Sequence, residues 1–202
     1  MEHWQTLEAE AFIARILSLP KGPGVSLNEV LQPSLNDEAE LRKLFATDKT
    51  NSRLKDPYAG LINVFAAPQD IRTTRARVVK DEQDLSAKYV LPLSDADRRK
   101  EGTPSMVTDL DEFKKNWKIF TENSLSQLLD WDNVVVAGVA VLACLSPLPN
   151  STKESWQSIR KYYHSVAYPP VVDLFLWGLD PEQVGHIYAY IHFDLTVSLG
   201  RD

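Results

Sequence analysis

The first half of the chain carries apolar residues at helical spacing, interrupted by short breaks. In residues 4–19 apolar side chains recur roughly every three or four positions, and the Pro- and Gly-rich residues 20–24 follow directly. This pattern predicts an amphipathic N-terminal helix followed by a hinge. Further along, Asn36 or Asp37 can cap a short helix that runs to Phe45.

The clearest helix is expected over residues 109–122. Acidic residues stand at its start, where they complement the positive end of a helix, and lysines lie further on. Apolar residues recur along one side of it and predict a buried stripe, formed by Leu110, Phe113, Trp117 and Phe120.

From residue 133 onward the pattern changes to short strands. Residues 133–137 and 171–177 are largely apolar, which is typical of buried strands. In residues 193–199 apolar and polar side chains alternate, which predicts a third strand. Between the second and third strands, Asp180 is expected to cap a helix, with Gln183 completing a capping box.

These elements predict an α+β fold. We expect residues 1–24 to form the N-terminal helix and hinge, residues 25–130 a mainly helical region, and residues 131–202 a small mixed sheet with helices. The largely helical N-terminal portion is expected to pack on the sheet, so that residues 25–130 and 131–202 form one compact unit. Free sheet edges need a cover, and a second copy of the chain in a homodimer could supply it.

Composition and charge narrow the classes of function. The chain has 202 residues and a net charge of −6, so it lacks the broad positive field that draws proteins to nucleic acid. Its longest near-apolar run, residues 134–145, is shorter than the about 20 residues of a membrane helix, and no membrane partner is expected. The single cysteine, Cys144, makes no intrachain disulfide and is expected to be buried. Together with an N-terminus unlike a signal peptide, this predicts a cytoplasmic or nuclear protein.

Candidate chemistry is concentrated at two joints of the expected sheet. After the first strand, residues 138–142 read Gly-Val-Ala-Val-Leu, and in the second strand residues 171–176 read Val-Val-Asp-Leu-Phe-Leu. In these residues the sequence resembles the nucleotidyltransferase superfamily, whose fold is shared by DNA polymerase beta. It is more closely similar to a group of uncharacterised fungal proteins with this core, some of which carry ankyrin repeats elsewhere. The closer resemblance covers about residues 28–183.

The resemblance implies a site for a metal ion and a nucleotide. In the group, the two joints usually read Gly-Gly-Ser-Val-Leu and Ser-Asp-Val-Asp-Leu-Phe-Leu. A glycine turn presents backbone N–H groups to a triphosphate, and two aspartates on one face of a strand hold Mg²⁺. Carried over to this chain, Mg²⁺ would be bound by Asp173 and the nucleotide phosphates by Gly138. Asp194 on the expected third strand could act as a further carboxylate, although no motif places it there. Apart from the resemblance, cations and aromatic residues are mixed in residues 160–164, where Arg160 and Lys161 could neutralise phosphate charge.

Three positions depart from the pattern of the group. Val139 replaces the second glycine, Ala140 replaces the serine and Val171 replaces the first aspartate. These losses predict a pseudoenzyme, a non-catalytic binding or regulatory protein on a degenerate nucleotidyltransferase-like scaffold. Two alternatives remain open: a Mg²⁺-dependent nucleotidyltransferase, and a protein interaction module that docks through the helix of residues 4–19.

Simpler interpretations accompany the candidate residues. Asp173 can be a strand residue that bonds neighbouring backbone or pairs with a Lys or Arg. Gly138 can be an ordinary strand-to-helix turn, and Arg160 and Lys161 can be solvated charges on an amphipathic helix. For each of these four residues, the functional and the simpler interpretation predict different contacts.

Overall fold

The protein is described by a computed structural model in which the chain divides into two compact units. They are the N-terminal unit, Met1–Pro104, and the C-terminal unit, Ser105–Asp202. The residues that the structure describes are 6–19, 27–74, 99–125, 128, 130–165 and 171–189. Helices and a small antiparallel sheet make up these parts, which confirms the α+β class. Each unit is a separate cluster of elements, and the two are taken in turn.

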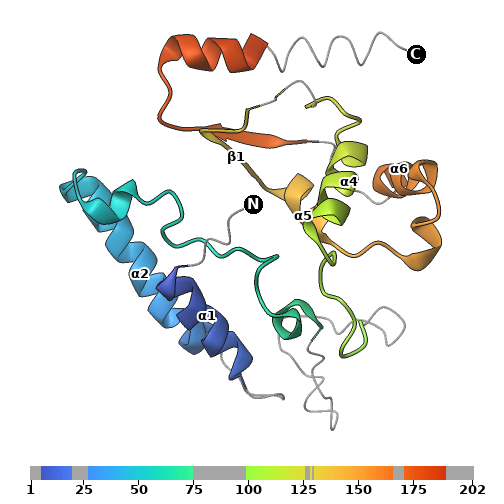
Figure 1. The fold of residues 1–202 in the computed structure, drawn as a ribbon, viewed down its shortest axis with the longest axis horizontal. Coiled ribbons are helices and arrows are strands. Elements are labelled where there is room, and N and C mark those ends of the chain that lie inside the picture. The colour runs from blue at the N-terminus through green and yellow to red at the C-terminus, as the bar shows by residue number, and fades with distance from the viewer. Residues whose placement is uncertain are drawn as a thin grey trace, which may run out of the picture. The chain divides into compact units, whose positions relative to one another are not determined.

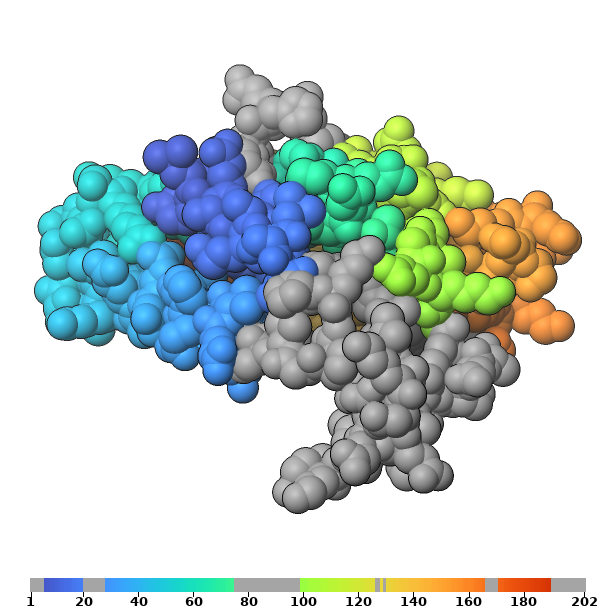
Figure 2. All heavy atoms as spheres, turned by 90° about the horizontal axis from the view of Figure 1, so that it is seen from below, coloured from blue at the N-terminus to red at the C-terminus, as the bar shows by residue number. Residues whose placement is uncertain are grey.

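Two helices form the main body of the N-terminal unit. Helix α1, Leu7–Leu17, begins at Thr6, whose Oγ1 accepts a hydrogen bond from the backbone N–H of Ala9 at 3.2 Å. Helix α2, Leu27–Thr47, lies alongside it, as the dark blue and lighter blue segments of Figures 1 and 2 show. The expected hinge, residues 20–24, lies outside the described residues.

Helix α2 is much longer than the sequence pattern predicted. The short helix expected to start at Asn36 or Asp37 is the second half of an unbroken helix that contains Pro33. A proline inside a helix removes one backbone hydrogen bond and usually kinks or ends it. Here Pro33 stands in the second turn, so the cost falls near the helix start and the remaining turns continue to Thr47.

Short irregular elements complete the N-terminal unit. They are the 3₁₀ helices η1, Ser52–Lys55, and η2, Gln69–Arg72, and an isolated β-bridge between Thr73 and Pro104. Helix α1 contacts both α2 and η2 and buries Ala9 and Ile13. The N-terminal helix is therefore packed within its own unit.

Three helices build the core of the C-terminal unit. Helix α4, Leu110–Phe120, packs against α5, Val139–Leu145, and against α6, Trp156–Ser165, with the 3₁₀ helix η3, Asn150–Thr152, leading into α6. Because α4 belongs with α5 and α6, the boundary between the units falls at residue 104, whereas the sequence pattern predicted a change near residue 130. The buried cluster consists of Ile119, Ala143, Leu148, Ile159 and Tyr163.

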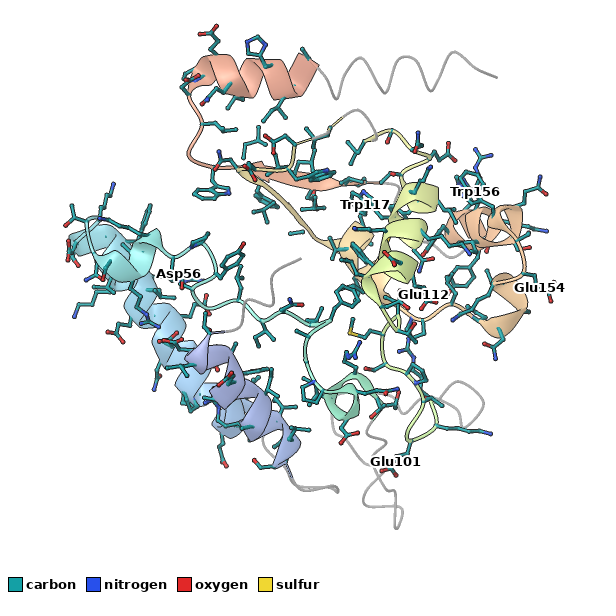
Figure 3. All side chains as sticks on the ribbon, in the orientation of Figure 1. Asp56, Glu101, Glu112, Trp117, Glu154 and Trp156 are labelled. Atoms are coloured by element: carbon teal, nitrogen blue, oxygen red, sulfur yellow. The ribbon has the colours of Figure 1, made fainter. Side chains whose placement is uncertain are left out.

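The buried face of α4 differs from the expected stripe. Its fully buried residues are Asn116 and Ile119, and the four predicted residues are only half-buried. Among those four, Trp117 packs against Phe113 and Trp131, with ring centroids 6.4 Å apart in both pairs. Figure 3 shows Trp117 on the side of α4 that faces the strands. The most buried side of α4 therefore packs against α5 and α6. Trp117 lies on another side of the helix, where it contacts Trp131 in the loop before β1.

The sheet in the described residues consists of two antiparallel strands. Strand β1, Val134–Ala137, pairs with β2, Asp173–Leu176, so that Val135 lies opposite Phe175 and Ala137 lies opposite Asp173. The two predicted strands are confirmed. The third predicted strand, residues 193–199, lies outside the described residues.

A helix follows β2 over residues 181–189, as predicted. Asp180 Oδ1 accepts hydrogen bonds from the backbone N–H groups of Glu182 and Gln183, both at 2.9 Å. Gln183 Oε1 accepts one in return from the Asp180 N–H at 2.9 Å. The expected capping box is therefore confirmed. No helix in the described parts of the chain has the length and apolar character needed to cross a membrane.

Candidate functional site

The turn between β1 and α5 depends on Gly138. Its backbone has φ +84° and ψ −157°, a conformation that residues with a β-carbon rarely adopt. A β-carbon placed on residue 138 would lie 2.6 Å from Oδ2 of Asp173, well inside van der Waals contact. Glycine is therefore favoured at this turn chiefly by its positive φ, and a β-carbon would in addition require the exposed Asp173 carboxylate to move.

Asp173 is placed beside the turn by the register of the sheet. It lies opposite Ala137, the last residue of β1, so its side chain reaches the residue that follows, Gly138. The carboxylate is exposed, and it makes no hydrogen bond or ion pair with any described residue. The simpler interpretation of Asp173, as a residue that bonds its neighbours, finds no support in the described part of the chain.

The three positions that depart from the nucleotidyltransferase pattern lie in different surroundings. Val171 and Val139 are exposed, whereas Ala140 is completely buried. A serine at position 140 would direct its hydroxyl into the core of the C-terminal unit. The position that the resemblance assigns to a phosphate-binding hydroxyl therefore faces away from the turn surface in this chain.

The described residues do not fit a Mg²⁺ site. Magnesium is held by several oxygen ligands, and two-metal chemistry needs carboxylates that bridge the ions. At the turn the structure provides Asp173, and Val171, two positions earlier in the chain and just before β2, offers no ligand oxygen. No group of three or more His, Cys, Asp or Glu side chains suited to a metal occurs among the described residues. Asp194, the expected further carboxylate, lies outside them.

Arg160 lies in a separate cluster with the end of α4. Its guanidinium donates to Oε1 of Glu122 from Nε at 2.8 Å and lies 2.7 Å from it through Nη2. His164 Nε2 lies 3.0 Å from the same oxygen. Partial burial opposes ionisation of Glu122, but the hydrogen bonds from Arg160 and His164 outweigh it and lower the pKa of this carboxyl. Arg160 is thus engaged by an acid, and Lys161 beside it is exposed.

Cys144 is completely buried in the core of the C-terminal unit. Burial raises the pKa of its thiol to about 12. Asn116 Nδ2 donates to the Cys144 carbonyl oxygen at 3.2 Å and ties α4 to α5. A thiol so resistant to ionisation has no role as a nucleophile at neutral pH.

The sequence patterns did not reveal an exposed apolar face around Asp173. On the outer side of the two strands, Val135 and Phe175 lie next to Ala137 and Asp173. Val171 precedes β2 and Trp177 follows it. The side chains of Val135, Val171, Phe175 and Trp177 are each 49–57% exposed. We call these six residues the β1–β2 face. The opposite side of the ribbon carries Val134, Val136, Leu174 and Leu176, which are half-buried. Apolar residues on both sides of the strands were the signal in the sequence, and we interpreted them as burial on both sides.

Gly138 and Asp173 are thus the only predicted site residues that the described structure brings together. Arg160 contacts Glu122 at the end of α4, and no described contact joins it to the turn. No protein-family model matches the chain, and neither curated proteins nor solved structures gave a match. The geometry of the C-terminal unit is therefore the basis for an assignment of function.

Proposed function

We propose that this chain is a non-catalytic binding protein whose C-terminal unit binds a protein partner through the β1–β2 face. The observation that carries the proposal is the exposure of Phe175 and Trp177 beside Val135 and Val171, around a carboxylate without a described partner. Contiguous exposed apolar residues on a folded domain mark interaction surfaces. Aromatic side chains contribute a large share of the binding energy at such surfaces.

The chemistry of the face indicates the chemistry of the partner. Val135 and Phe175 are directly opposite each other on neighbouring strands, so they form one continuous apolar surface. Asp173 adds a negative charge next to them. A partner surface that is apolar and carries a Lys or Arg side chain would cover the apolar residues and pair with Asp173.

Catalysis by nucleotidyl transfer is the weaker candidate. The approach of Asp173 to the Gly138 turn favours it, because a carboxylate and a glycine turn are parts of that site. A lone carboxylate at the turn repels phosphate unless a cation lies between them, however, and Val171 supplies no second ligand. Arg160, the expected phosphate contact, is bound to Glu122. The described residues therefore offer few contacts that could hold a nucleotide.

The N-terminal helix is the third candidate for partner binding. Its buried residues, Ala9 and Ile13, are already used for packing within the N-terminal unit. The β1–β2 face has no such internal use in the described residues, and we therefore favour it. A cytoplasmic or nuclear location remains part of this proposal, supported by the single buried cysteine.

Site-specific photocrosslinking tests the proposed face. A photoreactive residue at position 175, in the full chain expressed in its native host, should crosslink to one discrete partner. The same residue at position 156, where Trp156 is similarly exposed on α6, is the matched control and should not. Asp173→Lys should weaken the crosslink at 175, because it places a positive charge against the basic side chain of the partner.

The other outcomes are equally informative. Equal crosslinking from positions 175 and 156, or none from 175, would contradict the proposal. A product at twice the mass of the chain would assign the face to self-association in a homodimer, and the hetero-partner would then be wrong.

A further inference from the structure

A cavity of about 500 Å³ lies in the N-terminal unit between α1, α2 and residues 59–62. Its lining is mostly apolar and includes Phe12, Leu35, Leu41 and Leu61. Small-molecule sites are typically concave, mostly apolar and about 300–1,000 Å³ in volume, with a few polar groups that fix the ligand. The cavity has this size and character, and it is separate from the β1–β2 face.

The cationic group in the lining of the cavity is Arg15 of α1. Its Nη2 donates to Ser34 Oγ on α2 at 2.8 Å, and its guanidinium carbon lies 5.9 Å from the centre of the Phe12 ring. Its Nε is buried and has no hydrogen-bond acceptor among the described residues. A partly desolvated guanidinium is stabilised when an anion lies beside it.

The acids that line the cavity are engaged elsewhere. Asp37 forms an ion pair with Arg53, and Glu38 forms one with Arg42. The third, Glu8, lies 4.0 Å from Arg53. Among the described residues, therefore, Arg15 has a hydroxyl and an aromatic ring as partners and no carboxylate.

Ser34 completes the polar end of the cavity. Its Oγ accepts from Arg15, and its own hydroxyl proton makes no hydrogen bond with a described residue. A guanidinium and a free hydroxyl side by side suit a carboxylate, whose two oxygens accept charge-assisted hydrogen bonds. The apolar residues along the rest of the cavity suit a hydrocarbon chain.

We propose that this cavity binds a small amphiphilic carboxylate. The carboxylate contacts Arg15 and Ser34, and the apolar tail lies between α1 and α2 against Phe12, Leu35 and Leu61. This site goes beyond the proposed function, because it lies in the other unit and uses none of the residues of the β1–β2 face.

Calorimetric titration of the full chain with decanoate tests the site. Decanoate should bind the wild-type chain, and the Arg15→Gln variant should bind it about tenfold more weakly, the loss expected for one charge-assisted contact. Lys43→Gln is the matched control, because it removes one positive charge from the exposed side of α2, outside the lining of the cavity. Decanol, which has the same chain without the charge, should bind the wild-type chain more weakly than decanoate does.

Two further variants keep the test decisive if Arg15→Gln alters the fold. Arg15→Lys retains the charge and should retain most of the affinity. Ala11→Phe adds bulk at an exposed position in the lining and should block the tail while circular dichroism stays unchanged. The proposal is overturned if decanoate does not bind the wild-type chain, if it binds Arg15→Gln as tightly as wild type, or if decanol matches it.

Discussion

Oδ2 of Asp173 lies 2.6 Å from the point that a β-carbon on residue 138 would occupy. The two residues are far apart in the sequence and meet because β2 pairs with β1 in the register that sets Asp173 opposite Ala137. The carboxylate therefore occupies the space that the glycine leaves open.

Gly138→Ala should destabilise the C-terminal unit by about 1–3 kcal/mol, because the new β-carbon meets both a positive φ and the Asp173 carboxylate. Urea unfolding measures the loss. Gly185→Ala is the matched control: Gly185 lies in the helix of residues 181–189 with nothing within 4 Å of a β-carbon, and it should gain about 0.4–1 kcal/mol. In the background of Asp173→Ala, Gly138→Ala should cost less, since the steric part is relieved. An unchanged cost would mean that the backbone conformation alone requires the glycine.

Asp173→Ala should leave the free energy of unfolding within about 0.5 kcal/mol of wild type, as is usual for an exposed residue without bonds to its neighbours. Asp180→Ala gives the contrast, because Asp180 caps the following helix through two backbone N–H groups. Its loss should cost about 1 kcal/mol. The same chemical denaturation experiment compares the two. A larger cost at Asp173 than at Asp180 would show that Asp173 is a structural residue.

Thermal-shift titrations with ATP, GTP, CTP and UTP should show no shift that depends on Mg²⁺ or Mn²⁺. A native-state ligand at 100 times its Kd would add about 2.7 kcal/mol, which the measurement detects readily. Val171→Asp places a second carboxylate at an exposed position two residues before Asp173 and should create a Mn²⁺-dependent shift. Val184→Asp adds the same charge on the exposed helix of residues 181–189 and should not. A metal-dependent nucleotide shift with the wild-type chain would favour the nucleotidyltransferase instead.

Glu112 should make the stability of the C-terminal unit depend on acid pH. Burial opposes its ionisation, but the Thr108 backbone N–H at 3.0 Å and Lys153 Nζ at 3.0 Å outweigh it and hold its pKa below the ordinary value of 4.5. A carboxyl whose pKa is lowered on folding stabilises the native state above the unfolded value, and this contribution disappears as the pH falls through the folded value.

Glu112→Gln should therefore cost about 1 kcal/mol at pH 7 and progressively less as the pH falls below 4.5. Glu154 follows Lys153 in the chain and is exposed, and Glu154→Gln serves as the control with little effect at either pH. The measurement is urea unfolding across this pH range. An equal cost at all pH values would show that the interaction does not depend on the charge of Glu112.

Local features of the fold were predictable from the sequence. The capping box at Asp180 and Gln183 is set by residues three positions apart, and it formed as expected. The strands of β1 and β2 and the burial of Cys144 follow from short apolar runs in the same way. The predicted start of α2 at Asn36 or Asp37 was wrong, because these residues lie inside a helix that begins at Leu27. Pro33 does not end this helix, since a single proline in the second turn removes only one hydrogen bond.

Features that depend on distant neighbours were not predictable from the sequence. Asn116 is buried in α4 because its side chain reaches the carbonyl of Cys144, a contact that helical spacing does not reveal. The pairing of Arg160 with Glu122 likewise joins α6 to the turn that follows α4, and it engages a candidate phosphate contact. The register of β1 and β2 had to be known to see that Asp173 lies beside Gly138. The exposure of the outer side of these strands had to be known to distinguish a binding surface from a buried one.

The turn also bears on how a shared glycine should be interpreted in other chains. The positive φ of residue 138 favours glycine whatever the turn binds. A glycine at this position in another protein, with an aspartate opposite the preceding residue, would therefore indicate the same turn conformation. It would not by itself indicate nucleotide binding or catalysis.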